Sequence, residues 1–309
     1  MAAEAPVREG YVAFRGYRTW YRIVGEREAA GKFPLLVLHG GPGASYDYLE
    51  PIGAIAATGR RVVFYDQLGG GNSDHPSNPA LWTPELFVEE VGAVRDALGL
   101  ERTHLLGQSW GGVLAMEYAL TQPAGLLSLV IANSPASMPQ FLEGVNQLRE
   151  LLPMAVQQTL LRHEAAGTTD DPEYEAAMHA FYRRHLCRSD PWPDCLLRTF
   201  EQMSKYPEVY RTMNGPSEFH VIGTIKDWDV TDRLGEIRVP ALIVAAHHDE
   251  VTPGVAAIAH RGIAGSEWVL FEHSAHCPHL EEPARYMAVL DDFLIRVEAT
   301  TWGNVYEMD

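Results

Sequence analysis

Short, continuous runs of apolar residues recur along the chain, and longer segments with helical spacing separate them. An uninterrupted apolar run of about four to eight residues is typical of a strand that a parallel sheet buries on both faces. Alternating strands and helices predict an α/β fold with a mostly parallel central sheet flanked by helices. The strands predicted in this way are residues 34–38, 61–66, 103–106, 126–133, 239–246 and 267–271.

The two ends of the chain depart from this alternation. Residues 11–24 contain two β-type runs around Gly16, which predicts an antiparallel hairpin at one edge of the sheet. From residue 300 to residue 309 we expect a loose tail, in which Trp302 and Tyr306 are able to dock on the core. The predicted helices of the core are residues 84–98, 113–119 and 283–297.

A long segment in the second half of the chain has a different character. Residues 138–228 show helical patterns, more charge and no buried-strand run, and turn-forming proline clusters punctuate them. We therefore predict a helical cap inserted into a single α/β core. The predicted parts are residues 1–135 for the first part of the core, 136–228 for the cap, and 229–309 for the second part of the core.

Composition excludes several classes of partner. The formal net charge of -17 disfavours nucleic acid and anionic membranes, and it tolerates cationic ligands. No apolar run approaches the ~18 residues of a membrane span, and the first residues lack the charged and apolar regions of a secretion signal. We therefore expect no membrane association, and a monomer or small homo-oligomer.

The cysteines bear on compartment and on metal binding. Cys187, Cys195 and Cys277 form neither a metal-binding spacing nor an even set for disulfides, which favours a reducing compartment. The prediction is a cytoplasmic protein without a metal site or a cofactor.

The chemistry centres on the segment Gly-Gln-Ser-Trp-Gly-Gly at residues 107–112. A predicted strand precedes it and a helical segment follows it, which is the setting of a nucleophile elbow. The chain must turn sharply there with Ser109 in a strained conformation, so side chains at 107 and 111 would collide with the turn. Ser109 would stand at the end of the strand, where the helix N-terminus favours the negative charge that develops during acyl transfer.

A serine hydroxyl is a weak nucleophile and needs a base, and that base needs an orienting carboxylate. Where an elbow carries the serine, the acid and then the histidine follow it along the chain. Asp249 follows the predicted strand 239–246, and His276 follows the strand 267–271, so we predict them as the acid and the base. The competing candidates are Glu250, His273 and His279.

A glycine-rich loop, His-Gly-Gly-Pro-Gly at residues 39–43, follows the first buried strand. Glycines allow backbone N–H groups to approach a ligand closely, so we predict that Gly40 contributes to substrate binding. In parallel sheets, ligands bind beyond the carboxyl ends of the strands. We therefore expect this loop, the elbow and the two later loops to converge.

Taken together, these motifs resemble the proline iminopeptidase (prolyl aminopeptidase) family of α/β-hydrolase serine peptidases, which includes related amino-acid amidases. The cap outside residues 214–219 matches no motif of that family. The segments that carry the resemblance are residues 38–43, Asp66-Gln67 with Gly69, Gly71 and Ser73, and residues 107–112, 214–219, 249–253, 276 and 279–283.

The resemblance implies a role for each matching residue. Ser109 would be the nucleophile, with Asp249 and His276 as its partners. The backbone N–H groups of Gly41 and Trp110 would form the oxyanion hole. A helical cap would cover the site, and two carboxylates would recognise a free α-amino group. The residues implied for that recognition are Glu218 and Glu250.

The function implied is a serine hydrolase that releases an N-terminal residue through an acyl-enzyme. The substrate would be a small peptide or an amino-acid amide that begins with proline or another small apolar residue. An alternative is an amidase or esterase for a specialised small molecule, in which Glu218 and Glu250 are ordinary solvated carboxylates. A third hypothesis is a ligand-binding protein that kept the fold and lost catalysis, and the intact set of Ser109, Asp249 and His276 argues against it.

Overall fold

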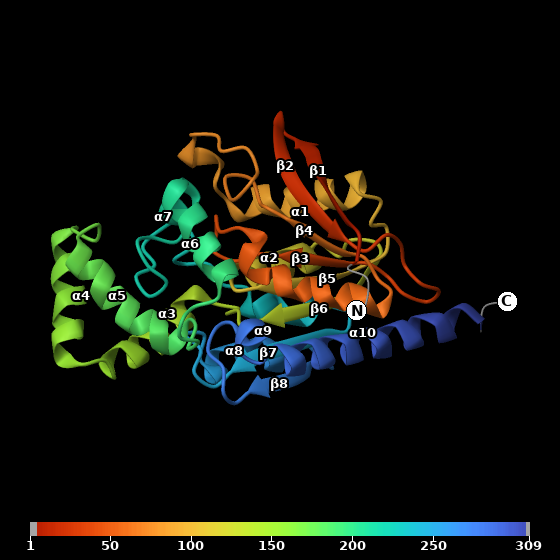
Figure 1. Ribbon diagram of the computed structural model, residues 1–309. Helices are drawn as coiled ribbons and strands as arrows, with labels where there is room; N and C mark the ends of the chain where they lie inside the picture. The colour runs from red at the N-terminus through yellow and green to blue at the C-terminus, as the bar shows by residue number, and fades with distance from the viewer. Residues whose placement is uncertain (1–4, 307–309) are drawn as a thin grey trace.

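The computed structural model describes residues 5–306 and contains one eight-stranded sheet (Figure 1). The strand order is β1-β2-β4-β3-β5-β6-β7-β8; β1 and β2 are antiparallel to their neighbours and the other pairs are parallel. The predicted α/β class and the mostly parallel sheet are therefore confirmed. The strands are β1 Val7–Phe14, β2 Tyr17–Val24, β3 Leu35–Leu38, β4 Val62–Tyr65, β5 Thr103–Gln108, β6 Leu126–Ala132, β7 Ala241–Ala246 and β8 Glu267–Phe271.

The predicted N-terminal hairpin is present and lies at the sheet edge. Its strands pair from Val7 with Val24 to Phe14 with Tyr17, and the turn residue Gly16 has a positive φ of 86°. The hairpin begins at Val7 and not at Tyr11, because the polar residues before Tyr11 fit the exposed side of an edge strand.

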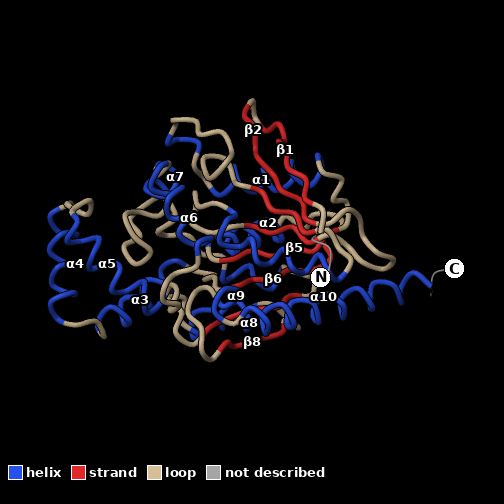
Figure 2. Tube along the Cα trace, viewed as in Figure 1, coloured by secondary structure: helices blue, strands red, loops and turns tan. Residues whose placement is uncertain are grey.

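Helices cover both faces of the sheet, as Figure 2 shows. One layer contacts β5, β6 and β7, and the other packs along β4 and β6. The first layer consists of α1 Pro84–Ala97, α2 Trp110–Leu120, η3 Thr231–Glu236 and α8 Pro253–Gly262. The second layer consists of η1 Tyr46–Thr58, α9 Pro278–Glu281 and α10 Pro283–Tyr306.

The last helix is longer than predicted. Helix α10 continues to Tyr306, so the expected tail from Thr300 is wrong as far as Tyr306. Glu298 explains the extension, because its buried carboxylate accepts hydrogen bonds from Arg60 at 2.7 Å and from the N–H of Phe33 at 3.1 Å, which holds the helix beyond Val297. Residues 307–309 and the side chains of Trp302 and Tyr306 lie outside the described part.

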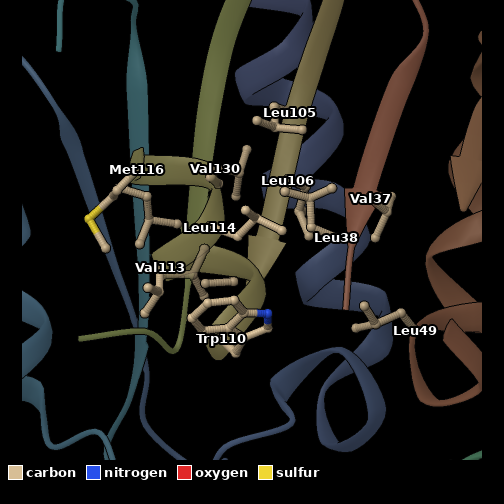
Figure 3. Close-up of a cluster of buried hydrophobic side chains, with 14 of the residues drawn as sticks. Val37, Leu38, Leu49, Leu105, Leu106, Trp110, Val113, Leu114, Met116 and Val130 are labelled. Carbon is tan, nitrogen blue, oxygen red and sulfur yellow. The ribbon is translucent and has the colours of Figure 1, made fainter. Parts of the chain in front are cut away.

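The core is densest where α2 packs on the central strands. Val113, Leu114 and Met116 of α2 belong to one cluster with Leu106 on β5 and Val130 on β6 (Figure 3). All of these side chains are fully buried, and each contributes about 1.5–3 kcal/mol by leaving water. This packing fixes the first turn of α2, and with it the position of Ser109.

Five helices are inserted between β6 and β7, and they lie together beyond one end of the sheet, at the left in Figure 1. The two ends of the insertion meet, because Ser137 and Asp229 form an antiparallel bridge. Within the described residues, no helix is long and apolar enough to cross a membrane. The inserted helices are α3 Met138–Glu150, α4 Met154–Ala166, α5 Pro172–His185, α6 Asp194–Lys205 and α7 Glu208–Met213.

Candidate active site

Ser109 occupies a sharp turn between β5 and α2, with φ 57° and ψ -126°. A Cβ at position 107 would lie 1.9 Å from the carbonyl oxygen of Gly111, and one at position 111 would lie 2.1 Å from that of Leu38. Only glycine fits at these two positions. The serine backbone is held in a conformation that costs about 1–3 kcal/mol, and the surrounding packing maintains it.

The predicted acid and base are in direct contact. Nδ1 of His276 donates to Oδ1 of Asp249 at 2.7 Å, and both side chains are buried. The same Oδ1 accepts the N–H of Val251 at 2.9 Å, while Oδ2 accepts the side-chain amide of Asn133 at 2.7 Å. The imidazole is therefore fixed with Nε2 free to face the nucleophile. Ser109 and His276 line the same cavity, which has a volume of about 40 Å³.

The competing candidates lie elsewhere. His273 is exposed on the surface. His279 is buried with Nε2 3.0 Å from the carbonyl oxygen of Tyr48, and burial lowers its pKa to about 3, so it stays neutral. Glu250 lies on the opposite side of the imidazole from Asp249, with Oε1 3.7 Å from Nε2 of His276. Of the candidates, Asp249 is the one that orients His276.

The loop carrying Gly41 is tied to the elbow through one side chain. Gln67 donates its amide to the carbonyl oxygen of His39 at 2.8 Å and accepts the indole N–H of Trp110 at 2.9 Å. Gly41 lines the cavity beside Ser109. Trp110 is the first residue of α2, so its N–H has no acceptor within the helix. Gly41 and Trp110 line one cavity together with Ser109, and their role as an oxyanion hole stays a prediction.

Gly40 lies in the frame that surrounds Ser109, and its role in substrate binding stays a prediction. Its N–H donates to the hydroxyl of Tyr48 at 2.8 Å. A Cβ at position 40 would lie 2.9 Å from Cβ of Ser109, so glycine is required there for space. The Tyr48 hydroxyl in turn donates to Gln108, whose amide donates to the carbonyl oxygen of His276 at 3.0 Å. Gly40 therefore belongs to the bonded frame of the site.

The two predicted amine-binding carboxylates share a second cavity with Ser109, of about 20 Å³. Glu218 is half-buried and accepts the hydroxyl of Tyr210 at 2.7 Å. Glu250 is 1% exposed, and its Oε2 is a buried oxygen without a hydrogen-bond partner among the described residues. Burial raises the pKa of Glu218, and raises the pKa of Glu250 well above its ordinary range. A cation in this cavity would relieve the cost of burying these carboxylates.

Comparison with known proteins identifies the family of the chain. The profile of a family described as alpha/beta hydrolase fold matches residues 34–283. A proline iminopeptidase from Saccharolobus solfataricus is 40% identical over 292 residues, which cover 94% of this chain and 93% of that protein. The chain belongs to the proline iminopeptidase family. The predicted family resemblance and the α/β-hydrolase fold are thus confirmed.

Two solved structures, one of them a proline iminopeptidase, are similar to the chain in three dimensions. Proline iminopeptidase from Mycobacterium smegmatis is 45% identical, with a TM-score of 0.89. The match covers 95% of this chain and 100% of that chain. The structure of VinJ is 46% identical with a TM-score of 0.91, covering 94% of this chain and 99% of that one. The similarity therefore includes the inserted helices as well as the core.

The charge around His276 predicts the pH dependence of this proline iminopeptidase family member. Burial alone would lower the pKa of His276, but the negative charges of Asp249 and Glu250 outweigh it and raise the pKa to about 9. A general base must be neutral, so kcat/KM is expected to rise with pH up to about 9. Glu250→Gln removes one of these charges, so the pKa of His276 falls and the acidic limb moves to lower pH.

The measurement is the pH profile of kcat/KM on an activated ester without an amine, so that the substrate itself does not titrate. Glu272→Gln is a suitable control, because Glu272 is exposed. Its profile should match that of the wild type. An acidic limb that stays in place or moves to higher pH in Glu250→Gln would contradict this account of the His276 charge.

Asn133 is a site residue that the sequence analysis missed. It directly follows β6, has a positive φ of 50°, and donates to Oδ2 of Asp249, 116 positions away along the chain. A turn-type asparagine after a strand is the only signal in the sequence, and it does not reveal this contact. By holding the carboxylate, Asn133 positions the acid that orients His276.

We expect Asn133→Gly to lower kcat/KM by about 10- to 100-fold, since a hydrogen bond to a charged group contributes about 1.5–3 kcal/mol. Glycine tolerates the positive φ, so the loss reports the missing amide and not backbone strain. Gln122→Gly is the matched control, because Gln122 is exposed with φ 52°. Steady-state kinetics of both variants test this, and equal rates would rule out a positioning role for Asn133.

His185, the last residue of α5, was also missed. Its carbonyl oxygen accepts the N–H groups of Glu250 and His276, both at 3.2 Å. Its Nδ1 lies 2.9 Å from the carbonyl oxygen of His248. One residue of the inserted helices therefore bridges the loop of the acid and the loop of the base. Each of these hydrogen bonds has a main-chain atom as donor, as acceptor or as both. No pattern of residue types could therefore predict them.

Proposed function

We propose that the chain is a serine aminopeptidase that releases an N-terminal residue, proline or another small apolar residue, from peptides or amino-acid amides. The observation that carries this proposal is the pair of carboxylates beside Ser109, one of them buried with an unpartnered oxygen. An esterase for a neutral substrate has no use for two poorly compensated acids in its site. A substrate ammonium group supplies the missing positive charge.

In the proposed mechanism, His276 takes the proton from the hydroxyl of Ser109, which attacks the carbonyl carbon of the first peptide bond. Asp249 holds the imidazole and stabilises its protonated form. The N–H groups of Gly41 and Trp110 donate to the oxyanion. His276 then gives its proton to the leaving amine, and an acyl-enzyme remains. Water, activated by His276, hydrolyses that ester and regenerates Ser109.

The carboxylates set the position of the scissile bond. Glu218 comes from the inserted segment and Glu250 follows the acid loop of the core, so an ammonium group held between them is fixed relative to both. Binding energy from the amine is then used to align the carbonyl carbon with Ser109. Substrates without the amine lose this alignment.

The remainder of the same cavity fits a small apolar residue. Met138 and Phe141 of α3 line it together with Trp110 and Val251. The names of the relatives, proline iminopeptidases, support proline as that residue.

We propose that residues 136–228 act as the cap of this site and that residues 1–135 and 229–309 form the core. The bridge between Ser137 and Asp229 supports these boundaries. A cytoplasmic monomer or small homo-oligomer is part of the same proposal, and the free thiols support a reducing compartment. These thiols are Cys187, Cys195 and Cys277.

The test is a panel of aminoacyl arylamides with free amines, covering prolyl, alanyl, glycyl, leucyl and glutamyl residues. The proposal predicts hydrolysis of prolyl or another small apolar residue, and little turnover of the glutamyl compound, whose side chain would add a third carboxylate. Failure to hydrolyse any member of the panel, with simple esters turned over rapidly, would refute the proposed aminopeptidase.

A further inference from the structure

A groove between α5 and α6 adjoins the cavity beside Ser109. Phe200 and Met203 of α6 line both the cavity and the adjoining part of the groove, as does Glu218. We call this adjoining part the inner part of the groove, and the part farther from Ser109 the outer part. Met178 on α5 and Ser204 on α6 line both parts. The shared lining residues place these spaces side by side, with volumes of about 240 Å³ for the inner part and 630 Å³ for the outer part.

The positions of Glu218 and Glu250 decide which part of a substrate faces this groove. This inference rests on the proposed function. Glu250 lines the smaller cavity and not the one that leads to the groove. An ammonium group held by Glu218 and Glu250 places the N-terminal residue in the smaller cavity. The chain beyond the scissile bond then leaves Ser109 on the other side, past Phe200 and Met203.

The lining of the groove changes along its length. Next to Ser109 it is apolar, with Leu186, Leu196 and Phe200. Farther out, Trp192 packs on Phe200 with ring centroids 5.4 Å apart. The outer part also carries charges of both signs, and these residues are Glu175, Arg183, Arg188 and Asp190. Apolar surface mixed with both charges suits a peptide with varied side chains better than a uniformly apolar leaving group.

We propose that the α5–α6 groove binds the leaving chain of a peptide substrate, for two or more residues beyond the scissile bond. A remote contact of this kind raises kcat/KM when its binding energy is used at the reacting centre. The enzyme would then favour oligopeptides over dipeptides and over aryl or simple amides, which end inside the cavity beside Ser109.

The test uses the full-length enzyme and a series of free-amine peptides. Each begins with the residue that the arylamide panel favours, followed by one, two, three or four alanines. We expect kcat/KM to rise by about tenfold along the series and then to level off. A factor of about ten is what the burial of one apolar side chain provides. A flat or falling series, in an enzyme that hydrolyses the arylamide, would overturn the groove proposal and leave the proposed function intact.

Variants that fill the groove provide the second measurement. Ser204→Trp should lower the ratio of kcat/KM for the longest peptide to that for the arylamide by about tenfold. Met178→Trp should do the same from the opposite helix. Glu201→Trp is the matched control, because Glu201 is an exposed residue of α6 outside the groove lining, and it should keep the wild-type ratio. If both groove variants keep that ratio, the groove does not bind the leaving chain.

Discussion

Ser109→Ala is expected to lower kcat by about 10⁴-fold or more while the fold stays intact. The hydroxyl is the group that would form the acyl-enzyme, and no neighbouring side chain can replace it. Alanine accepts the same backbone environment, so circular dichroism and the melting temperature should change little. A phosphonate should label the wild type at Ser109 and at no other serine, which mass spectrometry of the digested protein can establish.

Ser134→Ala is the matched control for this variant. Ser134 is a buried serine beside the elbow, close to Gly112, and it lines neither of the cavities at Ser109. Its rate should stay within a few-fold of the wild type. Two results would refute the assignment of Ser109 as nucleophile. One is a wild-type rate in Ser109→Ala, and the other is phosphonate labelling that persists in Ser109→Ala.

The second large effect concerns amine recognition. Glu218→Gln and Glu250→Gln should each raise KM for free-amine substrates, on the ~2–5 kcal/mol scale of a buried charge pair that loses one partner. Glu250→Gln should have the larger effect, because Glu250 is buried with an unpartnered oxygen while Glu218 already accepts the hydroxyl of Tyr210. Steady-state kinetics on the preferred arylamide provide the values.

An ester without an amine separates this role from a general loss of activity. Both variants should be much less impaired on such an ester, since the missing carboxylate has no cation to bind there. Glu272→Gln, at an exposed position, should behave as the wild type on both substrates. Equal losses on ester and arylamide would indicate damage to the catalytic residues and not to amine binding.

Much of the fold follows from simple patterns in the sequence. The apolar runs that become β3, β5 and β7 are buried on both faces, and a central parallel sheet requires this pattern. Helix ends are harder to predict. Beyond the predicted end of α10, Glu298 contacts Arg60 and Phe33, which lie far away in the sequence.

The predicted site residues divide along the same line. Ser109, Asp249 and His276 could be selected because each lies directly after a predicted strand, and parallel strands bring those ends together. The support from Asn133 and His185 could not be predicted, because it depends on a long-range side-chain contact and on a main-chain carbonyl. The hydrogen bond from the N–H of Gly40 to Tyr48 could not be predicted for a related reason, since it also depends on the folded arrangement.

The central claim is that the free α-amino group of the substrate is required, and one comparison tests it most directly. The wild-type rate on the preferred aminoacyl arylamide is measured beside the rate on the same compound after N-acetylation. The account predicts that acetylation lowers kcat/KM by about 10³-fold, because the neutral amide cannot pair with Glu218 and Glu250. Comparable rates on the two compounds would contradict it and would favour an amidase or esterase without an amine requirement.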